Sequence, residues 1–187
     1  PEGMRRRIVA WARRQGLAAG YAAQRGQRPP LLHGLARRLV FAKVRLALGL
    51  ERTKHTISSA APIALSTLEY FLSLGIAVRD VFGMSEVSGP ATMSLPGDLR
   101  TGRAGYAIPG SELRIAADGE LQVRGPHVFL GYYKDPAATR EALDEDGWLH
   151  TGDIGELDAD GYLRITDRKK ELLITSGGKN VAPAPIE

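Results

Sequence analysis

Four short segments carry side chains suited to binding a charged ligand. Phe82–Glu86 joins an aromatic ring to a hydroxyl and a carboxylate, and Trp148–Asp153 ends in a Thr-Gly-Asp sequence. Gly119–Gly125 lies between them, and Asp167–Glu171, which is dense in charge, begins fourteen residues after Asp153. A carboxylate accepts hydrogen bonds at both oxygens and suits Mg²⁺, and an aromatic ring offers a flat stacking face. A Thr-Gly-Asp turn by itself is common, so the specificity lies in the order and spacing of all four segments.

This ordered set resembles the adenylate-forming superfamily, and most closely its long-chain fatty-acid CoA ligases, which are acyl-CoA synthetases. The segments Leu39–Arg45 and Lys179–Pro183 point to the same branch, and the resemblance extends over essentially the whole chain. It implies that a fatty carboxylate attacks the α-phosphorus of ATP to give acyl-AMP, and that the thiol of CoA then displaces AMP. It therefore implies ATP, Mg²⁺ and CoA as cofactors, with fatty acid, ATP and CoA as the binding partners.

The resemblance assigns roles to individual residues. Ser85 and Glu86 are implied to be catalytic, because Glu86 holds Mg²⁺ and the Ser85 hydroxyl contacts the α-phosphate or the substrate carboxylate. Asp153 accepts from both ribose hydroxyls, and Arg168 reaches the same sugar. Phe82 stacks on adenine where tyrosine is usual, and Ser85 stands where threonine is usual. The residues implied to contact ATP or AMP are Ala60, Ala61, Pro62, Asp80, Val81, Phe82, Gly83, Met84, Ser85, Asp153 and Arg168.

Further residues are implied to act in the thioester step. Lys170 corresponds to the hinge about which a C-terminal domain swings, and Gly177, Gly178 and Lys179 lie in a loop that approaches CoA. This loop is not a Walker phosphate loop, because the upstream glycine and the hydroxyl residue after the lysine are missing. The family's own phosphate loop and C-terminal lysine are also missing from the 187 residues. We therefore expect a central fragment of a longer ligase, inactive by itself.

Each of these residues also has a plainer structural interpretation. Phe82 can be a core aromatic at the end of a strand, Glu86 a solvated acid, and the run Arg168–Lys170 an exposed charged surface. His150 is given no catalytic role, since a lone histidine is more often structural. The occurrence of all four segments in family order favours the ligand-binding interpretation.

Hydrophobic periodicity predicts two basic amphipathic helices followed by a βαβ unit. Apolar residues recur at helical spacing over 4–21 and 31–49, and 55–58 and 76–82 are typical of strands on either side of a helix over 63–74. Short strands flanking a helix pair in parallel through a right-handed crossover. Ligands of open parallel sheets bind beyond the carboxyl ends of the strands, so the loops after these two strands are expected to face one crevice.

From Arg103 onward the apolar period changes to two, which predicts antiparallel strands. Hairpins are expected at Asp118-Gly119 and Asp160-Gly161, with a short helix over 135–143 between them. The fold class is therefore α/β: part of a layered α/β N-terminal domain with helices and a parallel βαβ unit, a small antiparallel β-barrel-like region, and the start of a C-terminal α+β domain. The predicted boundaries are 1–100 (basic helices 1–50, βαβ unit 53–86), 101–166 for the barrel-like region, 167–171 for the hinge and 172–187 for the C-terminal domain.

Charge is distributed unevenly along the chain. Residues 1–55 carry thirteen lysines and arginines against two acids, although the net charge of the whole chain is only +4. Such a surface attracts nucleic-acid phosphates, anionic lipid headgroups or an acidic partner, and net charge does not choose among them. The plainer interpretation is that these helices pack against the sheet, and the ligand-binding alternative carried forward is peripheral contact with an anionic membrane through residues 1–50. The sequence shows no cysteine, no transmembrane run and no secretory leader, so we expect a cytoplasmic protein, peripheral at the inner membrane face, with no nucleic-acid partner.

Other interpretations stay open. An acyl-AMP ligase that hands its product to a carrier protein would share the same segments. A non-catalytic module that binds nucleic acid or membrane through its basic helices belongs to a different class, and an inactive paralogue is a third possibility. The interleaved aromatic and basic residues that stack nucleic-acid bases are sparse, which disfavours a nucleic-acid module. The favoured interpretation is an ATP-binding ligase of fatty-acid and lipid metabolism.

Overall fold

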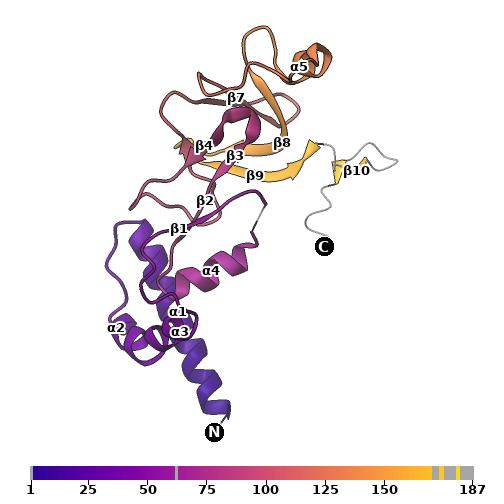
Figure 1. Cartoon of the computed structure of the whole chain (residues 1–187). Coiled ribbons are helices and arrows are strands. Elements are labelled where there is room, and N and C mark those ends of the chain that lie inside the picture. Colours follow the sequence, from indigo (N-terminus) through magenta and orange to yellow (C-terminus); the bar gives the residue numbers. More distant parts are fainter. Residues whose placement is uncertain (1, 62, 170–172, 175–179, 182–187) are drawn as a thin grey trace. The chain divides into compact units, whose positions relative to one another are not determined.

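The computed structural model describes residues 2–61, 63–169, 173–174 and 180–181, and the chain forms two compact units (Figure 1). The first unit comprises Pro1–Asp80 and Ser94–Gly102, and the second comprises Val81–Met93 and Arg103–Glu187. The chain enters the second unit at Val81, returns to the first unit over Ser94–Gly102 and enters the second unit again at Arg103. Each unit is therefore built from two separate stretches of sequence.

Both predicted basic helices are present in the first unit. The first is α1 (Glu2–Gln24), and the second is divided into α2 (His33–Ala36), a π-helical turn (Arg37–Phe41) and α3 (Ala42–Ala47). The apolar stripes of these helices pack into one small core together with residues of the segment that joins the following helix to the following strand. The buried members of this core are Ala12, Ala36, Phe41, Leu74 and Ile76. Burial of these stripes, more than helix propensity, stabilises helices whose outer faces are basic.

The predicted parallel βαβ unit follows. β1 (Thr56–Ser58) pairs in parallel with β2 (Val78–Asp80), and α4 (Leu65–Ser73) connects them. α1 packs against α4 at a glycine: a Cβ on Gly16 would overlap the carbonyl oxygen of Ser73. The missing side chain at Gly16 therefore lets the two helices approach closely.

The predicted strand over 76–82 is shorter than expected, because its last residue belongs to a different sheet. β2 ends at Asp80, and the next strand, β3 (Phe82–Met84), pairs antiparallel with β4 (Gly89–Met93). A 3-10 turn, η2 (Ser85–Val87), connects these two strands, and β5 (Tyr106–Ala107) completes a three-stranded sheet. The chain passes from the first unit into the second directly after β2.

The barrel-like region contains a four-stranded antiparallel sheet in the order β6-β7-β8-β9. Both predicted hairpins are confirmed, with Gly119 and Gly161 at φ values of +87° and +81°. The predicted short helix is α5 (Pro136–Ala142), and Asp135 caps it by accepting a hydrogen bond from the Ala138 amide at 2.9 Å. The strands are β6 (Glu112–Ile115), β7 (Glu120–Arg124), β8 (Leu149–Leu157) and β9 (Leu163–Arg168).

One hydrophobic core joins the three-stranded and four-stranded sheets of the second unit. Its buried members come from η2, β4, β7, β8 and β9, and they are Val87, Ala91, Leu121, Val123, Leu149 and Leu163. Farther along, β10 (Leu173–Ile174) pairs antiparallel with β11 (Asn180–Val181). The predicted fold class, a parallel βαβ unit followed by an antiparallel barrel-like region, is confirmed. The predicted domain boundaries at 100, 166 and 171 remain predictions.

Replacing Gly16 by alanine is expected to destabilise the first unit by about 1–3 kcal/mol, because the new methyl group forces α1 away from Ser73. The measurement is the free energy of unfolding by chemical denaturation. Gly34→Ala is the matched control, since nothing lies within 4 Å of the Cβ it would add in α2. Equal stability of the two variants would contradict the close packing of α1 and α4.

Candidate functional site

Asp153 and Arg168 face each other across neighbouring strands of the four-stranded sheet. They are register partners in the antiparallel pair β8–β9, and Arg168 Nε lies 3.1 Å from Asp153 Oδ1. The Asp153 side chain is only 9% exposed, whereas the Arg168 side chain is 65% exposed. The strands thus bring together the two residues that the sequence predicts to contact one sugar, and the guanidinium restrains the carboxylate.

Backbone and hydroxyl contacts hold the part of β8 that precedes Asp153. Gly152 has a φ of +73°, a left-handed conformation that favours glycine. The Thr151 hydroxyl donates to the Leu121 carbonyl oxygen at 2.7 Å and accepts from the Asp153 amide at 3.1 Å. The Thr-Gly-Asp sequence therefore ties β8 to β7 and orients the backbone of Asp153.

A buried carboxylate, Glu120, also binds this part of β8. It is 4% exposed and accepts hydrogen bonds from the Gly152 amide at 2.9 Å and the Lys169 ammonium at 3.0 Å, with His150 Nδ1 at 3.1 Å. Lys169 Nζ also lies 2.7 Å from Asp118 Oδ2. Burial acts to raise the pKa of Glu120, but the hydrogen bonds from His150, Lys169 and Gly152 outweigh it and hold the pKa below its ordinary value. This cluster fixes both the residues of β8 before the predicted ribose acceptor and the end of β9.

Glu86 lies in the short turn η2 and is half-buried. Its Oε1 accepts a hydrogen bond from the Tyr132 hydroxyl at 2.8 Å, and its carbonyl oxygen accepts from the Phe129 amide at 2.8 Å. Ser85, immediately before it, is exposed. The loop that precedes α5 therefore packs on η2 and holds the predicted metal ligand from two sides.

A single carboxylate at Glu86 suits a magnesium ion that arrives with a nucleotide. Mg²⁺ keeps several waters and is usually bound by one or two carboxylates together with substrate phosphates. Within the described residues, no three His, Cys, Asp or Glu side chains gather into a metal-binding group. The donor set therefore fits Mg²⁺ held jointly by Glu86 and phosphate oxygens.

Phe82, Gly83 and Met84 form β3, where each has a structural role. Phe82 and Met84 are partly buried and pack against the core of the second unit. The Phe82 amide lies 3.3 Å from Thr92 Oγ1 as a hydrogen-bond donor. A Cβ on Gly83 would overlap the carbonyl oxygen of Gly89, so β3 and β4 need a glycine where their register shifts. The plainer interpretation of these three residues therefore has structural support, and their contact with adenine remains a prediction.

Most of the other residues predicted to contact adenine belong to the first unit. Asp80 ends β2, and burial raises its pKa to about 6. Ala60 has a φ of +75° in the loop after β1, which Ala61 continues, and Val81 is the first residue of the second unit. Their nucleotide contacts stay predictions. The predicted site residues that lie outside the described part of the chain are Pro62, Lys170, Gly177, Gly178 and Lys179.

Three residues that the structure places in hydrogen bonds at or beside the predicted site have no role in the sequence prediction. Glu120 stands in a strand of buried residues, and a charged residue in such a strand is a usable signal of a polar contact. Lys169 belongs to a charged run whose sequence indicates only exposure. Tyr132 lies 46 residues from Glu86, and no periodicity relates the two positions.

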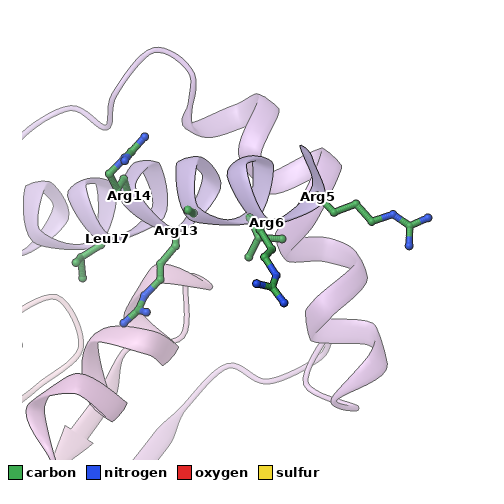
Figure 2. A pocket seen from close by; sticks show the side chains of 7 residues that line it. Arg5, Arg6, Arg13, Arg14 and Leu17 are labelled. Atoms are coloured by element: carbon green, nitrogen blue, oxygen red, sulfur yellow. The ribbon is translucent and has the colours of Figure 1, made fainter. Parts of the chain in front are cut away.

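A separate pocket lies along α1 in the first unit, and its lining mixes cationic with apolar side chains. Figure 2 shows Arg6, Arg13 and Leu17 on one side of the helix and Arg14 on the other. Met4, on the same helix, is 72% exposed. No helix within the described ranges is long and apolar enough to cross a bilayer. The pocket is lined by Arg5, Arg6, Val9, Ala10, Arg13, Arg14 and Leu17.

Residues 12–133 match the family described as AMP-binding enzyme, which is more than half of the chain. The chain belongs to the AMP-binding enzyme family. The predicted resemblance to adenylate-forming ligases is thereby confirmed. Glu86 and Tyr132 lie inside the matched range, whereas Asp153 and Arg168 lie beyond it.

This member of the AMP-binding family is similar to enzymes of fatty-acid activation. It is 46% identical over 190 residues to the long-chain-fatty-acid–CoA ligase ACSBG2 of Xenopus laevis, an alignment that covers 98% of this chain and 26% of the relative. The chain spans a quarter to a third of the length of the curated relatives it matches.

Two solved structures share the fold. O-succinylbenzoate CoA synthetase (MenE) from Bacillus subtilis, in complex with ATP and magnesium ion, has a TM-score of 0.63 and 31% identity, covering 78% of this chain and 34% of that one. ATP-bound MatB from Rhodopseudomonas palustris has a TM-score of 0.64 and 37% identity, covering 71% of this chain and 29% of that one. These likenesses support the fold class that the sequence predicts.

Replacing Glu120 by glutamine is expected to lower the free energy of unfolding by about 2 kcal/mol near pH 7, because charge-assisted hydrogen bonds to a buried carboxylate are lost. The folded pKa of Glu120 lies below 4.5, so its contribution is present above pH 4.5 and is lost as the pH falls through the folded pKa. Chemical denaturation at several pH values measures this, with Glu145→Gln at an exposed position as the control. A difference that persists unchanged in acid would contradict the ionic role of Glu120.

Proposed function

We propose that the chain is part of an ATP-dependent long-chain fatty-acid CoA ligase, which activates a fatty carboxylate as acyl-AMP and transfers the acyl group to CoA. Membership of the AMP-binding enzyme family and 46% identity to a long-chain-fatty-acid–CoA ligase support this class of reaction. The observation that carries the proposal within this chain is the Asp153–Arg168 pair, in which an exposed guanidinium restrains a buried carboxylate.

The side chains of the second unit have complementary roles in this proposal. Asp153 accepts hydrogen bonds from the ribose hydroxyls, because a carboxylate has acceptors only, and Arg168 holds that carboxylate and reaches the same sugar. Ser85 donates its hydroxyl to the α-phosphate or to the substrate carboxylate. Glu86 holds Mg²⁺, and the bound ion supplies positive charge where negative charge develops on the phosphates.

Bond changes in the proposed reaction occur in two steps. The fatty carboxylate attacks the α-phosphorus of ATP and releases pyrophosphate, and the CoA thiol then loses its proton, attacks the acyl carbonyl and releases AMP. Adenine stacks on Phe82, and Lys170 is the pivot between the steps. The remaining residues of the second unit that are proposed to contact adenine are Val81, Gly83 and Met84, and the segment proposed to approach CoA contains Gly177, Gly178 and Lys179.

Product analysis on the full-length protein tests this function. A long-chain fatty acid, ATP and CoA should yield acyl-CoA, AMP and pyrophosphate. Acyl-AMP that persists with CoA present and reacts only with a carrier protein would instead identify an acyl-AMP ligase. The absence of fatty-acid-dependent exchange of pyrophosphate into ATP would show that the protein does not form an acyl adenylate. That result would contradict the proposed function.

Replacing Asp153 by asparagine in the full-length protein is expected to raise the KM for ATP roughly 10- to 100-fold, because one acceptor oxygen becomes an amide donor and the charge is lost. The KM for the fatty acid should change little, since the sugar is bound separately from the acyl chain. Steady-state kinetics with Asp146→Asn, at an exposed position, provide the comparison. A wild-type KM for ATP in the Asp153 variant would exclude the ribose role.

We also propose that the protein is cytoplasmic and rests peripherally on an anionic membrane through residues 1–50. The support is the surface of α1, where exposed arginines and the exposed side chain of Val9 line one pocket and Met4, on the same helix, is also exposed. Cationic side chains are attracted to anionic headgroups, and apolar side chains enter the boundary with the acyl chains.

Joint replacement of Arg5, Arg6, Arg13 and Arg14 by glutamine is expected to weaken binding to phosphatidylserine vesicles by roughly tenfold or more, since each cation near the surface contributes about 1 kcal/mol. Co-sedimentation of the full-length protein with vesicles measures this, and vesicles of neutral lipid are the control. Equal binding of the variant and the wild-type protein would rule out this membrane surface.

A further inference from the structure

The carboxylate of Glu86 is held by a phenol from a distant part of the second unit. The Tyr132 hydroxyl donates to Glu86 Oε1 at 2.8 Å, although the two residues are 46 positions apart. A hydrogen bond to a charged acceptor is stronger than one between neutral groups. Within the described part of the chain, no hydrogen bond or ion pair engages the other oxygen, Oε2. The contact therefore occupies one oxygen of the carboxylate and leaves the second available to a ligand.

Backbone contacts fix the loop that carries this phenol to η2. The Phe129 amide donates to the Glu86 carbonyl oxygen at 2.8 Å, and the Ser88 hydroxyl donates to the His127 carbonyl oxygen at 2.9 Å. Phe129 packs against the core of the second unit. Tyr132 is thus attached, through Phe129, to the same turn that carries its hydrogen-bond acceptor.

The ring of Tyr132 is also restrained directly. Its centroid lies 4.9 Å from that of Phe129 with an interplanar angle of 76°, an edge-to-face arrangement that favours one orientation. The Tyr132 amide donates to Thr139 Oγ1 at 2.9 Å. Gly131 has a φ of +143°, and a Cβ there would overlap the Thr139 side chain, so the chain reaches this position only with glycine. These restraints place the hydroxyl before any ligand arrives.

The Tyr132 hydroxyl is the donor in this contact, because an ionised carboxylate oxygen can only accept.

We propose that Tyr132 is a positioning residue, whose hydroxyl holds the Glu86 carboxylate in one rotamer so that Oε2 is presented to the divalent cation of the bound nucleotide. This inference rests on the proposed function, because it requires Glu86 to bind Mg²⁺. Mg²⁺ accepts little deviation from octahedral geometry, so a carboxylate that rotates freely binds it less well than one already oriented. Tyr132 itself does not contact the ion.

The experiment measures equilibrium binding of ATP to the full-length protein by calorimetry at increasing Mg²⁺ concentration, without fatty acid, so that no turnover occurs. Tyr132→Phe removes only the hydroxyl and keeps the ring against Phe129. It should raise the Mg²⁺ concentration at half-maximal enhancement roughly threefold to tenfold, the size expected from the loss of one such hydrogen bond. Binding of ATP in the presence of a chelator should be unchanged. Tyr133→Phe is the matched control at an adjacent, 88% exposed position, and it should behave as wild type.

Glu86→Gln separates failure of this inference from failure of the proposed function. If Glu86→Gln weakens the Mg²⁺ enhancement and Tyr132→Phe leaves it at the wild-type value, Tyr132 has no positioning role, and the function of Glu86 stands. If neither substitution changes the enhancement, Glu86 does not bind the ion, and both statements are overturned. A Tyr132→Phe variant that weakens ATP binding equally with and without Mg²⁺ would show a general structural effect and would also overturn the inference.

Discussion

The hydrophobic core of the second unit is the constraint on which the candidate site depends. Val87, Leu121, Leu149 and Leu163 come from four different elements and are all buried in it. Full burial of such a side chain contributes about 1.5–3 kcal/mol. Val87 directly follows Glu86 in the chain, so the packing of one apolar side chain places a polar neighbour. Apolar packing sets the positions of the elements, and the polar contacts then adjust side chains within that frame.

Buried charge follows a second rule in the same unit. A carboxylate removed from water costs free energy unless cations and hydrogen-bond donors compensate it. Glu120 is compensated by the Lys169 ammonium, which directly follows β9, and by the Gly152 amide, which lies in β8. Because the Glu120 carboxylate needs both donors, it links the residue before the predicted ribose acceptor Asp153 to the residue after its partner Arg168.

Two of the acids with predicted ligand roles, Asp153 and Glu86, are each restrained by a donor from another element. Asp153 is paired with Arg168 from the neighbouring strand, and Glu86 accepts from Tyr132 in the loop before α5. Side chains oriented in advance lose less freedom when a ligand binds, so such restraints favour binding and catalysis. The chain belongs to the AMP-binding enzyme family, and a role of these restraints in nucleotide binding is part of the proposed function.

Residue types and spacing were sufficient for the βαβ unit, the hairpins at Gly119 and Gly161 and the cap at Asp135, because turns, caps and periodicity depend on neighbours in the chain. The order of four motifs was likewise sufficient for the family. Sequence did not determine where the strand over 76–82 ends, or that Lys169 contacts the buried acid Glu120 and Tyr132 contacts Glu86. Only the tertiary structure decided those partners, because residues more than forty positions apart meet through the packing of the core between their strands, and no local pattern encodes that packing.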